Sequence, residues 1–211
     1  MFFSAAYTDY RIIPRVAQHG KPQEFNMDLT IRVTLDLDWF HAGRAKANQV
    51  ITHALNHFAG GRRMFRHTPV HVQWHLAWGQ PNHDLRRTLQ IAFVPKDVLL
   101  KGDAGGLFVL KLDGDDYKVG RVLLPSEGLA KSRQIQVGSV GDGFRRVVAH
   151  EFGHTQGLPD DPTDSSTVMY FRELRPDQMR RISQRWSDQE LRDALQHLFA
   201  RPSELPSWLN S

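Results

Sequence analysis

The sequence of 211 residues contains no cysteine. Disulfide bonds therefore cannot stabilise the fold, and any metal site must use histidine, aspartate or glutamate rather than thiolates. No apolar run approaches the roughly 20 residues that a membrane-spanning helix requires. The first fifteen residues carry neither a basic nor a sustained apolar segment, so we expect no secretory signal, which leaves both the cytoplasm and export by another route open.

The composition is that of an ordinary globular protein, with 40% hydrophobic and 24% charged residues and a net charge of +4. Its length suits one compact domain. Arginines gather between residues 172 and 192, but acidic residues are interleaved with them. We interpret this region as a solvated helix face and not as a nucleic-acid surface, and we expect a monomer.

Hydrophobic periodicity predicts an alternation of strands and helices. Residues 1–26 show no clear period, and we expect an irregular arm there. Strands are predicted from alternating or apolar runs at residues 28–37, 70–77, 88–94, 107–112, 117–124 and 134–140. Helices are predicted over 42–59, over 144–156, and from Pro176 to about Ala200 with a break around Trp186 and Ser187.

This order of elements predicts an α+β fold with a mixed, twisted sheet and packed helices. We expect a single domain over residues 1–211. Its N-terminal lobe would cover about 27–157, and a small C-terminal lobe over about 158–211 would end in helices.

The segment VVAHEFGHTQGLPDD, residues 147–161, contains the candidate metal ligands and the candidate general base. His150 and His154 are four residues apart, so on a helix both imidazoles lie on one face and can reach one ion. Glu151 lies about 100° further around the helix axis, where it can act as a general base beside a metal. A His-Glu-x-x-His pattern is expected only about 0.02 times by chance in a chain of this composition, so it is the strongest signal in the sequence.

Gly157 favours a helix end at which the chain turns back, because glycine tolerates the positive φ of that position. The turn would bring Asp160 towards the ion as a third ligand. Asp161 and Asp164 are alternatives, and Glu173 would suit an arrangement in which a second helix supplies the ligand. We favour Asp160 because Gly157 has a role only in that arrangement.

This stretch resembles the metzincin metallopeptidases, whose pattern H-E-x-x-H-x-x-G-x-x-H is followed by a methionine-containing turn. Here His150, Glu151, His154, Gly157 and Asp160 fill the pattern. The third ligand is aspartate instead of histidine, as in the snapalysin-like variant of the clan, which has a similar G-L-P-D string. The specific resemblance covers about residues 147–171.

The resemblance implies a zinc-dependent endopeptidase with one catalytic Zn²⁺ and a protein or peptide substrate. It identifies Ser166–Tyr170 as the methionine turn, with Met169 as an apolar floor beneath the ligand histidines. Tyr170 is a candidate for the pocket that receives a substrate side chain, whereas Phe171 replaces the tyrosine that binds zinc in some relatives. A long helix should pack under a twisted sheet, and an edge strand within 107–124 should lie antiparallel to the substrate.

Other residues are weaker candidates for metal sites. His71 and His75 would share one face of a strand, with His67 and His83 nearby, and a second structural Zn²⁺ there stays open. The Asp113–Asp116 cluster is a candidate for structural Ca²⁺, although it lacks a dedicated loop spacing. His53 and His57 are four apart on a predicted helix without an acidic residue between them.

Two alternative functions share parts of this pattern. One is a metal-dependent hydrolase of a non-protein amide, which would have the same site and a different pocket. The other is a non-enzymatic module in which zinc is structural and the basic C-terminal region binds nucleic acid or protein. The glutamate at position 151 argues against the second alternative, because a structural site needs no carboxylate beside the ion.

Overall fold

In the computed structural model, the parts of the chain that the structure describes are residues 7–15, 23–35, 44–79, 88–95, 107–113, 117–126, 141–161, 167–170, 185–199 and 204–209. The strands in these parts are β1 (Thr8–Pro14), β2 (Phe25–Leu35), β3 (Gly61–Phe65), β4 (Thr68–Trp78), β5 (Leu89–Val94), β6 (Leu107–Asp113) and β7 (Tyr117–Pro125). The helices are α2 (Arg44–Phe58), α4 (Gly141–Thr155) and α6 (Asp188–Gln196).

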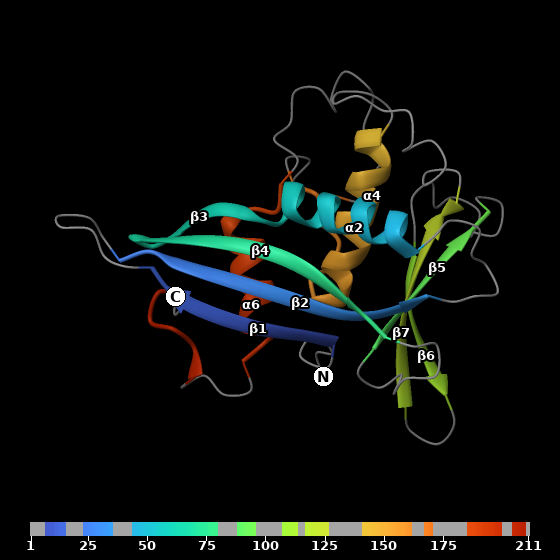
Figure 1. The fold of residues 1–211 in the computed structure, drawn as a ribbon, viewed down its shortest axis with the longest axis horizontal. Coiled ribbons are helices and arrows are strands. Elements are labelled where there is room, and N and C mark those ends of the chain that lie inside the picture. The colour runs from blue at the N-terminus through green and yellow to red at the C-terminus, as the bar shows by residue number, and fades with distance from the viewer. Residues whose placement is uncertain are drawn as a thin grey trace.

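The strands form one mixed, twisted sheet in the order β3-β4-β2-β5-β7-β6 (Figure 1). Strands β4, β2, β5 and β7 are parallel, and β3 and β6 lie antiparallel at the two outer positions. Strand β1 pairs antiparallel with Phe25–Ile31 of β2, and β5 continues along the same edge from Val33. The α+β class and the mixed sheet expected from the sequence are therefore confirmed.

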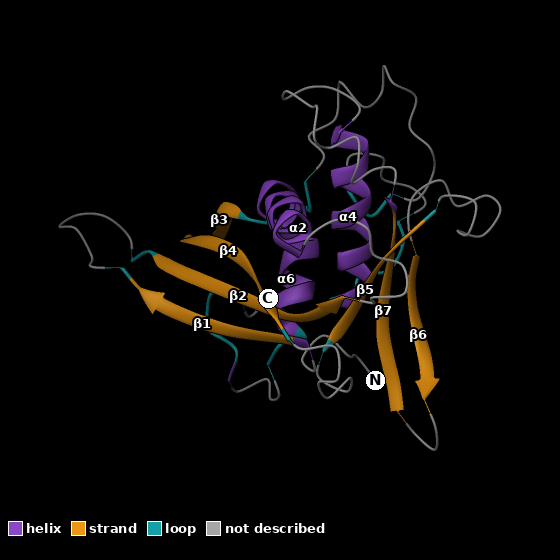
Figure 2. Cartoon of the chain, turned by 45° about the vertical axis from the view of Figure 1, so that its right-hand side comes forward, coloured by secondary structure: helices purple, strands orange, loops and turns teal. Residues whose placement is uncertain are grey.

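The core lies between one face of this sheet and the helices. Met27, Leu29, Ile31 and Val33 alternate along β2 and are all 0% exposed. Burial of each such side chain contributes about 1.5–3 kcal/mol to folding. Helix α2 packs on β4 and on α4, and α4 also contacts β6 and β7, so α4 is held between α2 and the far strands (Figure 2).

The edge of β4 beyond β3 is covered by α2. Strand β3 ends its pairing at Val72, and no other strand in the described part of the chain pairs with Trp74 on that side. The Asn56 side chain takes this place: its amide nitrogen donates to the Trp74 carbonyl at 2.9 Å, and its oxygen accepts from the Trp74 amide at 2.8 Å. One side chain thus replaces a strand residue and fixes α2 relative to the sheet.

Most predicted elements are present within three residues of their expected ends, but the irregular arm expected over residues 1–26 was wrong for residues 8–14 and 25–26. Residues 1–6 and 16–22 lie outside the described residues. Residues 8–14 form β1, which lies largely exposed and therefore shows no hydrophobic period. Strand β3 was also missed. The strand predicted at 134–140 and the helix start near Pro176 lie outside the described residues.

The C-terminal segment packs on the body of the protein through Trp208, which contacts Phe25 and Phe65, and through Leu209, which is 0% exposed. None of the helices in the described ranges has both the length and the apolar character needed to cross a bilayer.

Candidate metal centre

The C-terminus of α4 builds the first part of the site. The Leu158 amide donates to the Gly153 carbonyl at 3.1 Å, and the Gly157 amide donates to the His154 carbonyl at 3.0 Å. This pair of hydrogen bonds is a Schellman motif, which requires a left-handed residue after the helix, and Gly157 has φ +86°. The helix therefore ends where the sequence predicted, and the chain turns back towards Asp160.

Main-chain carbonyls orient both histidine rings. Nδ1 of His150 lies 2.9 Å from the Val168 oxygen, and Nδ1 of His154 lies 2.9 Å from the Leu158 oxygen. Because a carbonyl oxygen can only accept a hydrogen bond, each Nδ1 carries the proton. In the neutral rings Nε2 is then unprotonated, and its lone pair is available to a metal ion.

Three ligand atoms converge at this point. The Nε2 atoms of His150 and His154 are 3.2 Å apart, and Oδ1 of Asp160 lies 3.2 Å from the first and 3.4 Å from the second. A tetrahedral zinc ion with bonds of about 2.0–2.1 Å keeps its ligand atoms about 3.3–3.4 Å apart. The spacing therefore fits one small cation bound by all three side chains, and this group could hold a metal ion.

Charge and exposure also suit a cation. Two nitrogen lone pairs and one carboxylate oxygen repel each other unless a cation or a shared proton lies among them. Burial lowers the pKa of His150, and the nearby His154 and Arg146 lower it further. The Val168 carbonyl and Asp160 raise it, but the lowering effects are larger, so the neutral form of the His150 ring is favoured. The side chains of His150, His154 and Asp160 are 14%, 21% and 52% exposed, so the site opens to solvent on the aspartate side.

The turn of residues 167–170 lies under the histidines. A Cβ at Gly153 would overlap the sulfur of Met169, so with a larger residue there the Met169 side chain would have to shift away from α4 between His150 and His154. Met169 is 1% exposed. The Asp161 amide donates to the Met169 carbonyl at 2.9 Å, which ties the segment that carries Asp160 to the same turn.

Glu151 and Arg146 are two of the charged residues of α4. Glu151 directly follows His150 and is 5% exposed. Arg146 lies one turn before His150, and its Nη2 donates to the Tyr170 carbonyl at 2.5 Å. Burial lowers the pKa of Arg146 below its ordinary value. This half-buried cation also lowers the pKa of His150, by less than burial and His154 do.

His150, His154 and Asp160 form the one group of three potential ligands found within the described ranges. His53 and His57 stack with ring centroids 6.3 Å apart on the exposed face of α2 and belong to no such group. His71 and His75 lie on β4 and also belong to no such group in the described part of the chain. His83, Asp164, Phe171, Glu173 and residues 114–116 of the acidic cluster lie outside it.

A comparison of the sequence with protein-family models and with curated proteins finds no match. The interpretation of the site therefore depends on its own geometry.

Sequence reasoning missed three contributors to the site. The carbonyls of Leu158 and Val168 are main-chain groups, and no side-chain pattern identifies them. Arg146 could have been predicted from its spacing, because it is four residues before His150 and so shares its helix face.

Proposed function

We propose that this protein is a zinc-dependent endopeptidase of the metzincin type, closest to the snapalysin-like variant with aspartate as the third ligand. The observation that carries the proposal is the convergence of His150, His154 and Asp160 at 3.2–3.4 Å. Two imidazoles and one carboxylate, with the solvent side open, are the donor set of a catalytic zinc site and not of a closed structural one.

Three features of the fold support the metzincin type. Met169 lies against Gly153, which stands between His150 and His154 on α4, and this position supports a role as the methionine of the turn. Helix α4 packs against α2 and the twisted sheet. Strand β6 is the outer strand among the described residues, and an outer edge of a sheet suits an extended peptide added as a further strand.

A zinc ion at such a site lowers the pKa of a bound water and polarises a carbonyl group. The residues of the chain supply the rest. His150 and His154 are held in one orientation by their Nδ1 hydrogen bonds. Glu151 takes the proton of the attacking water and passes it to the leaving amine. Tyr170, in the turn next to the ligands, lines the pocket for a substrate side chain.

The test is cleavage of casein and of a peptide library by the purified protein, with and without a chelator. We expect cleavage that the chelator abolishes and that added Zn²⁺ restores. A parallel panel of acylated amino sugars separates this function from the hydrolysis of a non-protein amide. Zinc-loaded protein that cleaves no peptide would contradict the proposal, and cleavage of the amino sugars alone would favour the alternative.

A further inference from the structure

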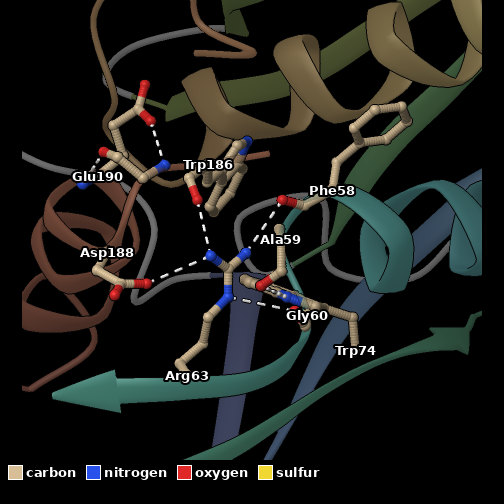
Figure 3. A network of polar contacts seen from close by, with 9 residues as sticks. Phe58, Ala59, Gly60, Arg63, Trp74, Trp186, Asp188 and Glu190 are labelled. Atoms are coloured by element: carbon tan, nitrogen blue, oxygen red, sulfur yellow. Dashed lines mark hydrogen bonds and ion pairs between the residues drawn. The ribbon is translucent and has the colours of Figure 1, made fainter. Parts of the chain in front are cut away.

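Arg63 is a buried cation outside the metal centre. It lies on β3 between two exposed residues, Arg62 and Met64, yet only 8% of its side chain is exposed. Its guanidinium donates to three carbonyls: from Nε to Gly60 at 3.2 Å, from Nη2 to Phe58 at 3.2 Å and from Nη1 to Trp186 at 2.9 Å (Figure 3). It also pairs with Asp188 at 3.3 Å. A single side chain thus joins two distant segments.

The first of these segments is the end of α2. The last carbonyls of a helix have no partner within the helix and carry its partial negative charge. Arg63 satisfies the carbonyl of Phe58, which also accepts a hydrogen bond from the Trp186 amide at 2.8 Å. The main chain of Trp186 is therefore bound on both sides, by Phe58 through its amide and by Arg63 through its carbonyl.

The second segment leads to the metal centre. The Trp186 side chain is 0% exposed and packs edge-on against Trp74, with ring centroids 5.8 Å apart. Its Cζ2 atom lies 3.4 Å from the point where a Cβ of Gly153 would stand, and the Met169 sulfur meets the same point. The indole and the thioether therefore share the surface of α4 between the two histidine ligands.

The turn that carries Met169 also carries the carbonyl that orients His150. A shift of Trp186 would open space at Gly153, where the Met169 sulfur also lies, and a movement of Met169 into that space would carry the Val168 carbonyl with it. The contacts thus form one continuous path: Arg63 to the main chain of Trp186, the Trp186 ring to the surface shared with Met169, and the turn to His150.

Stability alone is a weak reason for a buried arginine here. Removal of a guanidinium from water is costly, and an apolar residue of similar volume is often at least as stabilising. Arginine alone supplies rigid donors that can bind three carbonyls from two segments at fixed angles. Orientation of Trp186 is what this geometry provides.

We propose that Arg63 and Trp186 are positioning residues of the metal centre. Arg63 fixes Trp186 beside Met169, so that the turn of residues 167–170 keeps the Val168 carbonyl in place for His150. This inference rests on the proposed function for the presence of a metal at His150, His154 and Asp160.

The test measures Co²⁺ binding to wild type, Arg63→Met, Arg63→Lys and Trp186→Phe, from the visible absorption of the bound ion and by competition with Zn²⁺. Loss of groups that orient metal ligands typically weakens affinity about 10–100-fold. We expect a weakening in this range together with a changed absorption spectrum, which reports ligand geometry. Trp186→Phe keeps an aromatic ring, and it decides the question should an arginine variant fail to fold.

Two controls separate positioning from stability. Arg62→Met removes the neighbouring exposed arginine of β3, and Leu209→Ala opens a cavity in the C-terminal segment. Leu209→Ala should lower the unfolding midpoint while the folded protein keeps the affinity and spectrum of wild type, and Arg62→Met should change neither property.

The positioning proposal is overturned if folded Trp186→Phe and Arg63 variants bind Co²⁺ as wild type does. It is also overturned if Leu209→Ala weakens binding as much as they do. In both cases wild type still binds metal and the proposed function stands. A wild type that binds neither ion would instead overturn the metal centre itself.

Discussion

The Val168 carbonyl accepts a hydrogen bond from Nδ1 of His150 at 2.9 Å, although the two residues are 18 positions apart. The Leu158 carbonyl does the same for His154. Main-chain groups of the segments that follow α4 therefore hold both rings with Nε2 towards Asp160. The centre depends on the turn at Gly157 and on the turn at Met169 as much as on the helix.

Glu151 tests the chemistry separately from metal binding. Glu151→Gln keeps the shape of the side chain and removes its ability to accept a proton. We expect an unchanged zinc content and a fall in kcat of about 10²–10⁴-fold, the usual contribution of a general base. Steady-state kinetics with a fluorogenic peptide measure the effect, and full activity in this variant would refute the assignment.

Asp160 tests the third ligand. Asp160→Ala removes the only anionic member of the converging group, so we expect metal affinity to fall at least tenfold in a titration with a competing chelator. Asp28→Ala, on the face of β2 away from the core, is the matched control and should bind metal normally. Equal affinity of Asp160→Ala and wild type would move the third ligand elsewhere, with Glu173 as the next candidate.

Gly153 and Met169 should be energetically coupled. Gly153→Ala places a methyl group against the Met169 sulfur, and overpacking of this kind typically costs about 1–3 kcal/mol. In a Met169→Ala background the space is free, so the same substitution should cost much less. A double-mutant cycle from urea unfolding measures the coupling, and additive effects would show that the two positions do not contact each other.

Titration of Glu190 should make the stability of the protein depend on pH. Burial raises the pKa of its carboxyl above the ordinary 4.5, although its hydrogen bonds to Ser187 act against this. The folded state then favours the protonated form, so this contribution to stability is complete below the ordinary pKa. The stabilisation is lost as the pH rises through the raised pKa of Glu190 in the folded state.

Glu190→Gln does not titrate. In urea unfolding of the metal-free protein between about pH 4 and 7, the stability of Glu190→Gln relative to wild type should rise with pH and then level off. A difference that stays constant with pH would show that burial does not shift this group.

Periodicity predicted the parts of the fold that follow simple burial. Strand β2 buries every second residue, and α2 ends at the glycine pair after Phe58, so both were recognisable. The convergence of His150, His154 and Asp160 was recognisable because a helix fixes the relative directions of positions 150 and 154, and because Gly157 signals the turn. In each case a local geometric rule connects spacing to position.

The missed elements lack such a rule. Strand β1 is largely exposed, and its place is set by pairing with β2 rather than by its own pattern. Strand β3 buries Arg63 in its core-facing row, and a buried arginine does not produce an apolar alternation. Arg63 binds main-chain carbonyls up to 123 positions away and the carboxylate of Asp188, which only the folded chain brings together.

Zinc analysis of the purified protein tests the central claim most directly. After loading with Zn²⁺ and removal of the excess, we predict about one ion per chain in wild type, by the one-ion geometry of such sites. The double variant His150→Asn, His154→Asn should retain almost none. A wild type that retains no zinc at micromolar concentration, or a double variant that retains as much as wild type, would contradict the account.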